Sequence, residues 1–142
     1  MDKNVPYAIE TEVDAVFSLC GDVKAGFPSP AEDIGEKLDL VQLLVKHKAS
    51  TFFFRVSGVS MVDAAMDEGD IIIVDRSITP YNGCKAVCYI DGEYTVKRVE
   101  ILPDKVRLLP ANEHNTMYKP IEITPDNTFT IWGVVTYVIK KM

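Results

Sequence analysis

The sequence lacks the features that would assign it to several common classes of protein. It has no apolar run close to the ~20 residues that span a bilayer, and its acidic N-terminal stretch does not have the charged-then-apolar order of a signal peptide. Its Lys and Arg residues form no basic stripe, and the formal net charge is −6. We therefore expect a cytoplasmic protein that binds neither a membrane nor DNA directly.

Cysteine and histidine are also scarce. Cys20, Cys84 and Cys88 form an odd set without a secretory signal, which argues against a disulfide framework. The spacing of the last two does not match a zinc-ribbon pair, so we expect reduced thiols and neither a metal nor a cofactor. The two histidines, His47 and His114, stand in polar contexts that do not favour a Ser-His-Asp triad.

What the chain does have is a β-rich body. From residue 51 onwards, short segments rich in β-branched and aromatic residues are separated by turn signals, including Asn82-Gly83 and Asp91-Gly92. The Asp-Gly pair between two such segments predicts a two-residue hairpin. The expected strands are TFFFRV, DIIIVD, KAVCYI, EYTVKRVE, KVRLL, IEI and FTIWGVVTYVI. The sequence thus predicts a mainly-β protein.

The N-terminal part differs in composition. Residues 1–25 carry two lysines against five acids and show weak periodicity, which predicts a mobile arm. Pro28 and Pro30 favour an extended backbone in the segment that follows. Apolar residues in LDLVQLLVKH (38–47) predict one short helix. We therefore expect an arm over residues 1–25 and a β domain over residues 26–142.

The segment RVSGVSM (55–61) places two serines on a glycine-flanked turn. A serine hydroxyl is a weak nucleophile until a base takes its proton. Lys97 lies in EYTVKRVE, where strand alternation places Thr95, Lys97 and Val99 on one face. If Lys97 points inward, desolvation lowers its pKa, whereas an arginine would stay charged. A solvated strand lysine is the alternative explanation of the same pattern.

A longer set of segments supports the catalytic interpretation. In order and spacing, SGVSM, DEGDIIIVD, NG, DGEYTVKR, LLPANE and FTIWGVV resemble the self-cleaving domain of the LexA/UmuD family, over roughly residues 26–138. The resemblance implies compact, curved antiparallel sheets of the LexA C-terminal-domain type. By position it implies that Ser60 is the nucleophile and Lys97 its base. Backbone N–H groups of the turn from Gly58 to Met61 are candidates to hold the oxyanion.

The family's substrate is its own chain, cut N-terminal to the catalytic core at Ala-Gly or Cys-Gly. Here VKAGFPSP presents Ala25-Gly26 at the matching place. A small alanine suits a shallow pocket, and glycine lets the backbone pass close to the serine. Considered alone, the same pair before prolines is a linker signal. The expected reaction is attack of Ser60 on the Ala25 carbonyl, followed by hydrolysis of the acyl-enzyme.

The resemblance also implies a place within the family. A LexA-type repressor has a helix-turn-helix domain before the cleavage site, and the 25 residues before Gly26 are too few for one. This implies the short branch, a homodimeric accessory subunit of an error-prone translesion polymerase in the SOS DNA-damage response. The implied partners are a UmuC-type polymerase and a RecA nucleoprotein filament that promotes cleavage. The apolar GVVTYVI suits a dimer edge, although core burial explains it equally well.

Two alternatives stay open at this point. A type I signal peptidase also uses a Ser-Met serine and a lysine base, but it needs a membrane anchor or an exposed apolar surface, and SMVDAA lacks the proline that usually follows. A non-catalytic β module that only docks a polymerase would leave Ser60, Lys97 and Ala25-Gly26 without a role.

Overall fold

The computed structural model describes residues 16–28, 30 and 35–142. The chain divides into two compact units, residues 1–43 and residues 44–142, and each is described by itself. The predicted processing boundary after Ala25 lies inside the first unit, and residues 1–15 of the predicted arm lie outside the described residues. None of the helices in the described segments has the length and apolar character that crossing a membrane requires.

The first unit contains an antiparallel strand pair that the sequence did not predict. β1 (Val16–Leu19) pairs with β2 (Glu36–Asp39) through four residue pairs. All four side chains of β1 are exposed, so it lacks the apolar alternation that would have marked it as a strand. The predicted helix follows β2 directly as α1 (Leu40–Leu44). It is shorter than expected because residues 38 and 39 belong to β2, where the Asp39 side chain accepts a hydrogen bond from the Gln42 amide at 3.2 Å.

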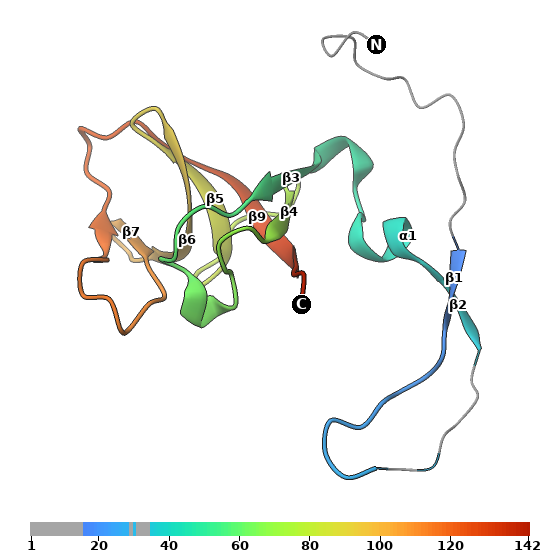
Figure 1. The fold of residues 1–142 in the computed structure, drawn as a ribbon. Helices are drawn as coiled ribbons and strands as arrows, with labels where there is room; N and C mark the ends of the chain where they lie inside the picture. The colour runs from blue at the N-terminus through green and yellow to red at the C-terminus, as the bar shows by residue number, and fades with distance from the viewer. Residues whose placement is uncertain (1–15, 29, 31–34) are drawn as a thin grey trace, which may run out of the picture. The chain divides into compact units, whose positions relative to one another are not determined.

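The second unit is built on one antiparallel sheet of seven strands, in the order β3-β4-β9-β5-β6-β7-β8 (Figure 1). Every expected strand is present, and the fold is mainly antiparallel β with one short α-helix in the described residues. The strands are β3 (Thr51–Arg55), β4 (Ile71–Asp75), β5 (Lys85–Ile90), β6 (Glu93–Ile101), β7 (Val106–Leu109), β8 (Ile121–Glu122) and β9 (Phe129–Ile139). Two short 3-10 turns, Lys48–Ser50 and Val62–Ala64, join some of them.

The Asp-Gly hairpin is confirmed at the turn between β5 and β6. Asp91 and Gly92 have φ angles of 48° and 89°, and Ile90 pairs with Glu93 on either side of them. Two successive positive φ angles define the turn type whose twist matches that of the flanking strands. This hairpin places β6, and Lys97 with it, beside β5.

β9 runs through the middle of the sheet with staggered neighbours (Figure 1, red). Its first half, residues 129–134, pairs with β5, and its second half, residues 134–139, pairs with β4. Gly133 lies where the two pairings meet, and a Cβ atom there would come within 2.5 Å of the Val74 side chain, so only glycine fits. In the part of the chain that the structure describes, no strand pairs with residues 135–139 on the β5 side.

Two clusters of buried apolar side chains stabilise this unit. Fully burying one aliphatic side chain contributes roughly 1.5–3 kcal/mol, so each cluster outweighs any single surface contact. The first cluster contains Val56, Met61, Met66, Ile72, Val74 and Val87. The second contains Cys84, Ala86, Cys88, Val99, Leu108 and Val134. Cys84 and Cys88 are free thiols, as expected.

Candidate active site

The serine turn, residues 57–61, follows β3 and is anchored at both ends. Before it, the Val56 amide donates to the Asp70 carbonyl at 2.8 Å, and the Gly69 amide donates to the Val56 carbonyl at 2.9 Å. After it, the Met61 side chain is 1% exposed. Within the turn, Gly58 has a φ of 91°, which favours glycine. These anchors use backbone groups and a buried side chain, and none of them involves the hydroxyl groups of Ser57 or Ser60.

A second segment, residues 110–113, holds the serine turn from another side. The Ala111 amide donates to the Ser60 carbonyl at 2.7 Å, and Asn112 Nδ2 donates to the Val59 carbonyl at 2.9 Å. The segment is fixed in turn by the Asp63 amide, which donates to the Ala111 carbonyl at 2.8 Å. The composition of LLPANE does not indicate which loop this segment contacts, so the family resemblance is the only signal that the sequence gives for it.

The structure brings Ser60 and Lys97 together. Lys97 Nζ lies 2.8 Å from Ser60 Oγ, 2.9 Å from Thr95 Oγ1 and 3.1 Å from the Val96 carbonyl oxygen. Thr95 and Lys97 share a strand face, as the alternation predicts. Burial lowers the pKa of Lys97 below its ordinary value, because the ammonium loses water. The neighbouring Cys88 is no source of negative charge, since burial raises the pKa of its thiol to about 12.

Ser60 and Lys97 line a groove of about 160 Å³ between the end of β3 and the start of β6. Ser57 also lines it, yet of the two serines only Ser60 contacts the lysine through its hydroxyl group. Among the described residues that line the groove there is no carboxylate, so no opposite charge in the lining stabilises the Lys97 ammonium. The lining residues are Phe54, Arg55, Val56, Ser57, Ser60, Ile72, Val87, Tyr94, Thr95, Val96 and Lys97.

The predicted scissile pair lies in an exposed bend of the connection between β1 and β2, in the first unit. Val23 and Phe27, on either side of Ala25-Gly26, are both 93% exposed. Apart from the two neighbours in the chain, no residue that the structure describes would come within 4 Å of a Cβ atom at Gly26. The fold of this bend therefore does not itself require glycine at position 26.

The oxyanion candidates, Gly58 and Met61, both lie in the anchored turn. Neither backbone amide donates a hydrogen bond to another group in the described residues. Free backbone N–H groups next to a serine hydroxyl are the donors that stabilise a tetrahedral oxyanion.

A second polar cluster surrounds His47 and lies at a separate pocket. His47 Nδ1 is 2.6 Å from Asp75 Oδ2 and 3.0 Å from Ser77 Oγ, and Ser77 Oγ donates to Asp75 Oδ1 at 2.7 Å. A catalytic triad needs its serine and its carboxylate on opposite ring nitrogens, whereas both contact Nδ1 here. His114 lies in the loop between β7 and β8. The geometry therefore forms no Ser-His-Asp triad at His47.

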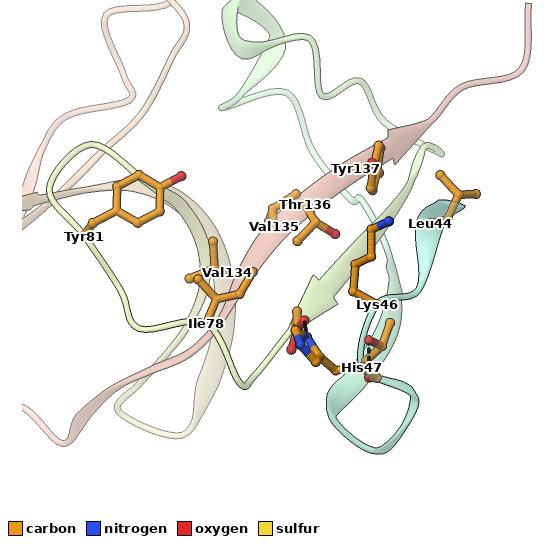
Figure 2. A pocket seen from close by; sticks show the side chains of 11 residues that line it. Leu44, Lys46, His47, Ile78, Tyr81, Val134, Val135, Thr136 and Tyr137 are labelled. Carbon is orange, nitrogen blue, oxygen red and sulfur yellow. Dashed lines mark hydrogen bonds and ion pairs between the residues drawn. The ribbon is translucent and has the colours of Figure 1, made fainter. Parts of the chain in front are cut away.

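The pocket beside His47 has a volume of about 400 Å³ and follows β9 (Figure 2). Figure 2 shows Val134, Val135, Thr136 and Tyr137 along the strand, with Ile78 and Tyr81 on one side and Leu44, Lys46 and His47 on the other. Burial alone would raise the pKa of Asp75, which lines the pocket, but hydrogen bonds from His47, Ser77 and Ser50 outweigh burial and hold the pKa well below its ordinary value. The cluster is structural: it joins residues 47–50 to the end of β4.

Comparison with known proteins identifies the family of this chain. The family model described as Peptidase S24-like matches residues 18–136. Protein MucA of Salmonella typhimurium is 43% identical over 117 residues, which cover 81% of this chain and 77% of MucA. Protein SamA of Salmonella typhimurium is 40% identical over 118 residues, 82% of this chain and 79% of SamA.

A longer relative also matches the same part of the chain. The LexA repressor of Stenotrophomonas maltophilia is 37% identical over 116 residues, which cover 82% of this chain and 54% of the repressor. The resemblance to the LexA/UmuD family is therefore confirmed by the short relatives MucA and SamA and by the longer LexA repressor. The chain belongs to the Peptidase S24-like family and is a LexA-like, self-cleaving serine peptidase.

Proposed function

We propose that this chain cuts its own Ala25–Gly26 bond, with Ser60 as the nucleophile and neutral Lys97 as the general base. The observation that carries the proposal is the 2.8 Å separation between Lys97 Nζ and Ser60 Oγ in a groove without carboxylates. The substrate is the exposed bend that contains the scissile pair, which docks in the groove. The arm over residues 1–25 is the fragment released, and residues 26–142 keep the catalytic and dimerisation functions.

The contacts of Lys97 support its role as base. A neutral amine has two N–H groups and one lone pair, and Lys97 Nζ has three polar neighbours. Thr95 Oγ1 and the Val96 carbonyl accept the two N–H groups, which leaves the lone pair directed at the Ser60 hydroxyl. Burial already lowers the pKa of Lys97, and a docked peptide would remove more water from it. Docking by itself therefore favours the reactive, neutral form.

The chemical steps follow from this arrangement. Lys97 takes the hydroxyl proton as Ser60 Oγ attacks the Ala25 carbonyl carbon, and the turn amides stabilise the oxyanion that forms. The Ala25–Gly26 bond then breaks as the Gly26 nitrogen receives a proton. Water hydrolyses the ester between Ala25 and Ser60. Because the substrate is part of the protein, a high effective concentration compensates for modest intrinsic catalysis.

We propose as the biological role an accessory subunit of an error-prone translesion polymerase in the SOS DNA-damage response. Its partners are a UmuC-type polymerase, bound after processing, and a RecA nucleoprotein filament, which promotes docking of the bend. Support comes from the match to most of the length of the short relatives, 77% of MucA and 79% of SamA, against 54% of the LexA repressor.

The proposed homodimer uses the second half of β9. On the β5 side, no strand of the described chain pairs with residues 135–139, and Tyr137 and Ile139 are 39% and 42% exposed. An exposed apolar strand edge is normally protected by pairing. A second copy of the same strand satisfies this edge symmetrically.

Alkaline self-digestion tests the peptidase activity. Purified protein incubated near pH 10 is expected to yield slowly a fragment that begins at Gly26, because Lys97 becomes neutral without an activator. Mass spectrometry of the products identifies the new N-terminus. An intact chain, or a cut at another bond, refutes the proposed reaction.

Three variants assign the roles in this assay. Ser60→Ala and Lys97→Ala are each expected to abolish cutting and to leave the circular dichroism spectrum unchanged. Gly26→Asp is expected to block cutting by crowding the docked strand. It is expected to leave the bend itself intact, because apart from the two neighbours in the chain no described residue has an atom within 4 Å of the Cβ position. If one of these variants still cuts at the wild-type rate, the residue changed in that variant does not have the proposed role.

A further inference from the structure

Residues 110–113, between β7 and β8, contact the serine turn at two consecutive carbonyl groups. Asn112 Nδ2 donates to the Val59 carbonyl at 2.9 Å, and the Ala111 amide donates to the Ser60 carbonyl at 2.7 Å. These two carbonyls belong to the two peptide groups that flank the Ser60 α-carbon. The contacts therefore set the orientation of both peptide groups next to the nucleophile.

The orientation of a carbonyl also sets the orientation of the next amide. In a trans peptide the C=O and N–H bonds point in opposite directions, and the structure contains no cis peptide in its described residues. Holding the Val59 carbonyl against Asn112 turns the Ser60 amide away from residues 110–113. Holding the Ser60 carbonyl against Ala111 does the same for the Met61 amide. Neither amide donates a hydrogen bond elsewhere in the described chain.

We infer that Asn112 is a positioning residue for self-cleavage, which orients the Ser60 amide toward the oxyanion by holding the Val59 carbonyl. The inference rests on the proposed function and adds a residue to it. Asn112 acts only through Val59, so it is not a catalytic residue. Its side chain is the replaceable part of the contact, because the Ala111 contact is made by the backbone and survives a change of side chain.

The rest of the segment is fixed independently of Asn112. The Asp63 amide donates to the Ala111 carbonyl at 2.8 Å, and the Glu113 amide donates to Asp63 Oδ2 at 2.6 Å. These bonds hold both sides of position 112 when its side chain changes. A substitution there is therefore expected to remove one hydrogen bond and to leave the path of the segment unchanged.

The test compares Asn112→Asp, which has no side-chain donor, with Asn115→Asp in the same loop. Asn115 uses its oxygen to accept from the Met117 amide at 3.0 Å, so aspartate keeps that bond and adds the same charge. Asn112→Ala removes the same side-chain donor without adding a charge. Deleting an oxyanion donor costs ~100- to 1,000-fold in rate, and misorienting one is expected to cost about 10- to 100-fold. The measurement is the rate of cutting at Ala25–Gly26 from pH 7 to pH 11.

The expected result is slow cutting in both Asn112 variants, wild-type cutting in Asn115→Asp, and the same midpoint of the rate–pH curve in all of them. An unchanged midpoint separates an effect on the oxyanion from one on Lys97. A shifted midpoint, or a wild-type rate in either Asn112 variant, refutes the inference alone. Absence of cutting in the wild-type chain refutes the proposed function and the inference with it. If Asn112→Asp unfolds, Asn112→Ala at matched thermal stability decides the question.

Discussion

At the residue scale, the central fact is a lysine placed where water cannot fully solvate its charge. Lys97 lies among Thr95, Val96 and Ser60, and burial lowers its pKa. Arginine would stay charged at any accessible pH, so the identity of the residue matters as much as its position. Strand alternation predicted the face on which Lys97 lies. It did not predict that the serine turn reaches that face, because the turn and β6 are far apart in the sequence.

The titration of Lys97 gives a pH profile. The base works only when neutral, so the cutting rate is expected to rise with pH and to level off above the pKa of Lys97. Because burial lowers this pKa, the midpoint is expected to fall below 10.5, the ordinary value. Initial rates of cutting between pH 6 and pH 11, under single-turnover conditions, measure the midpoint. A rate that falls as the pH rises in this range would exclude lysine as the base.

Asp75 gives a prediction about stability. Its carboxylate is 4% exposed and accepts hydrogen bonds from Ser50 and Ser77 at 2.9 and 2.7 Å. Asp75→Asn is expected to lower the free energy of unfolding at pH 7 by about 1–3 kcal/mol. The amide keeps one acceptor oxygen and replaces the other by an NH2 donor, so either His47 or the two serines lose their acceptor. Urea titration measures the difference, with the exposed Asp104→Asn as control.

The loss of unfolding free energy in Asp75→Asn is also expected to depend on pH. The folded-state pKa of Asp75 is held below its ordinary value, so its contribution is fully present above the unfolded-state pKa, about 4. It is lost as the pH falls further, through the folded-state pKa. The difference in the free energy of unfolding between wild type and Asp75→Asn is therefore expected to become smaller below pH ~4. A difference that grows below pH ~4 would mean that the charged Asp75 carboxylate is not what stabilises the folded protein.

At the element scale, strands with alternating or continuous apolar residues could be predicted, and β1 could not. TFFFRV and DIIIVD are strands by composition alone, and the Asp-Gly turn defines the β5–β6 hairpin. β1 is exposed along its length and depends on pairing with β2. The same dependence makes β1 and β2 sensitive to cleavage, because the proposed cut lies in their connection.

We expect β2 to lose its partner after cleavage. Four cross-strand pairs contribute at most about 1–4 kcal/mol in total, which does not exceed the estimated 4–15 kcal/mol that association of separate chains costs. Hydrogen exchange of the amides in residues 36–39 is therefore expected to accelerate when the arm is cut, while residues 71–75 in β4 stay protected. Equal protection of β2 before and after cutting would show that the arm remains bound.

At the scale of the whole molecule, the course of β9 decides which surface a second copy can use. GVVTYVI is apolar enough for either a core or an edge, and the structure assigns its first part to the core and leaves the later edge unpaired. Val134 is 2% exposed, whereas Tyr137, three residues later, is 39% exposed. The change follows Val134, the last residue of β9 that pairs with β5.

The proposed dimer can be tested at this edge. In a Ser60→Ala background, which prevents cutting, Tyr137→Asp is expected to convert a dimer into a monomer at micromolar concentration, because it places a charge in an apolar interface. Light scattering coupled to size-exclusion chromatography measures the mass. Met117→Asp, at a residue that is 86% exposed in another loop, is the control. A dimer that survives Tyr137→Asp uses a different surface.

The sequence by itself determined the chemistry available to this protein: a mainly-β body, a serine on a glycine turn, a strand lysine and an Ala-Gly bond in an exposed stretch. These follow from local propensity and residue type, which depend on neighbours along the chain. Only the tertiary structure decided that the Ser60 hydroxyl and the Lys97 amine lie 2.8 Å apart. It also decided that Asn112 contacts the serine turn, through the Val59 carbonyl. Such contacts join residues separated by 37 and 53 positions. Their geometry depends on how the whole sheet curves and packs, which no short stretch of sequence specifies.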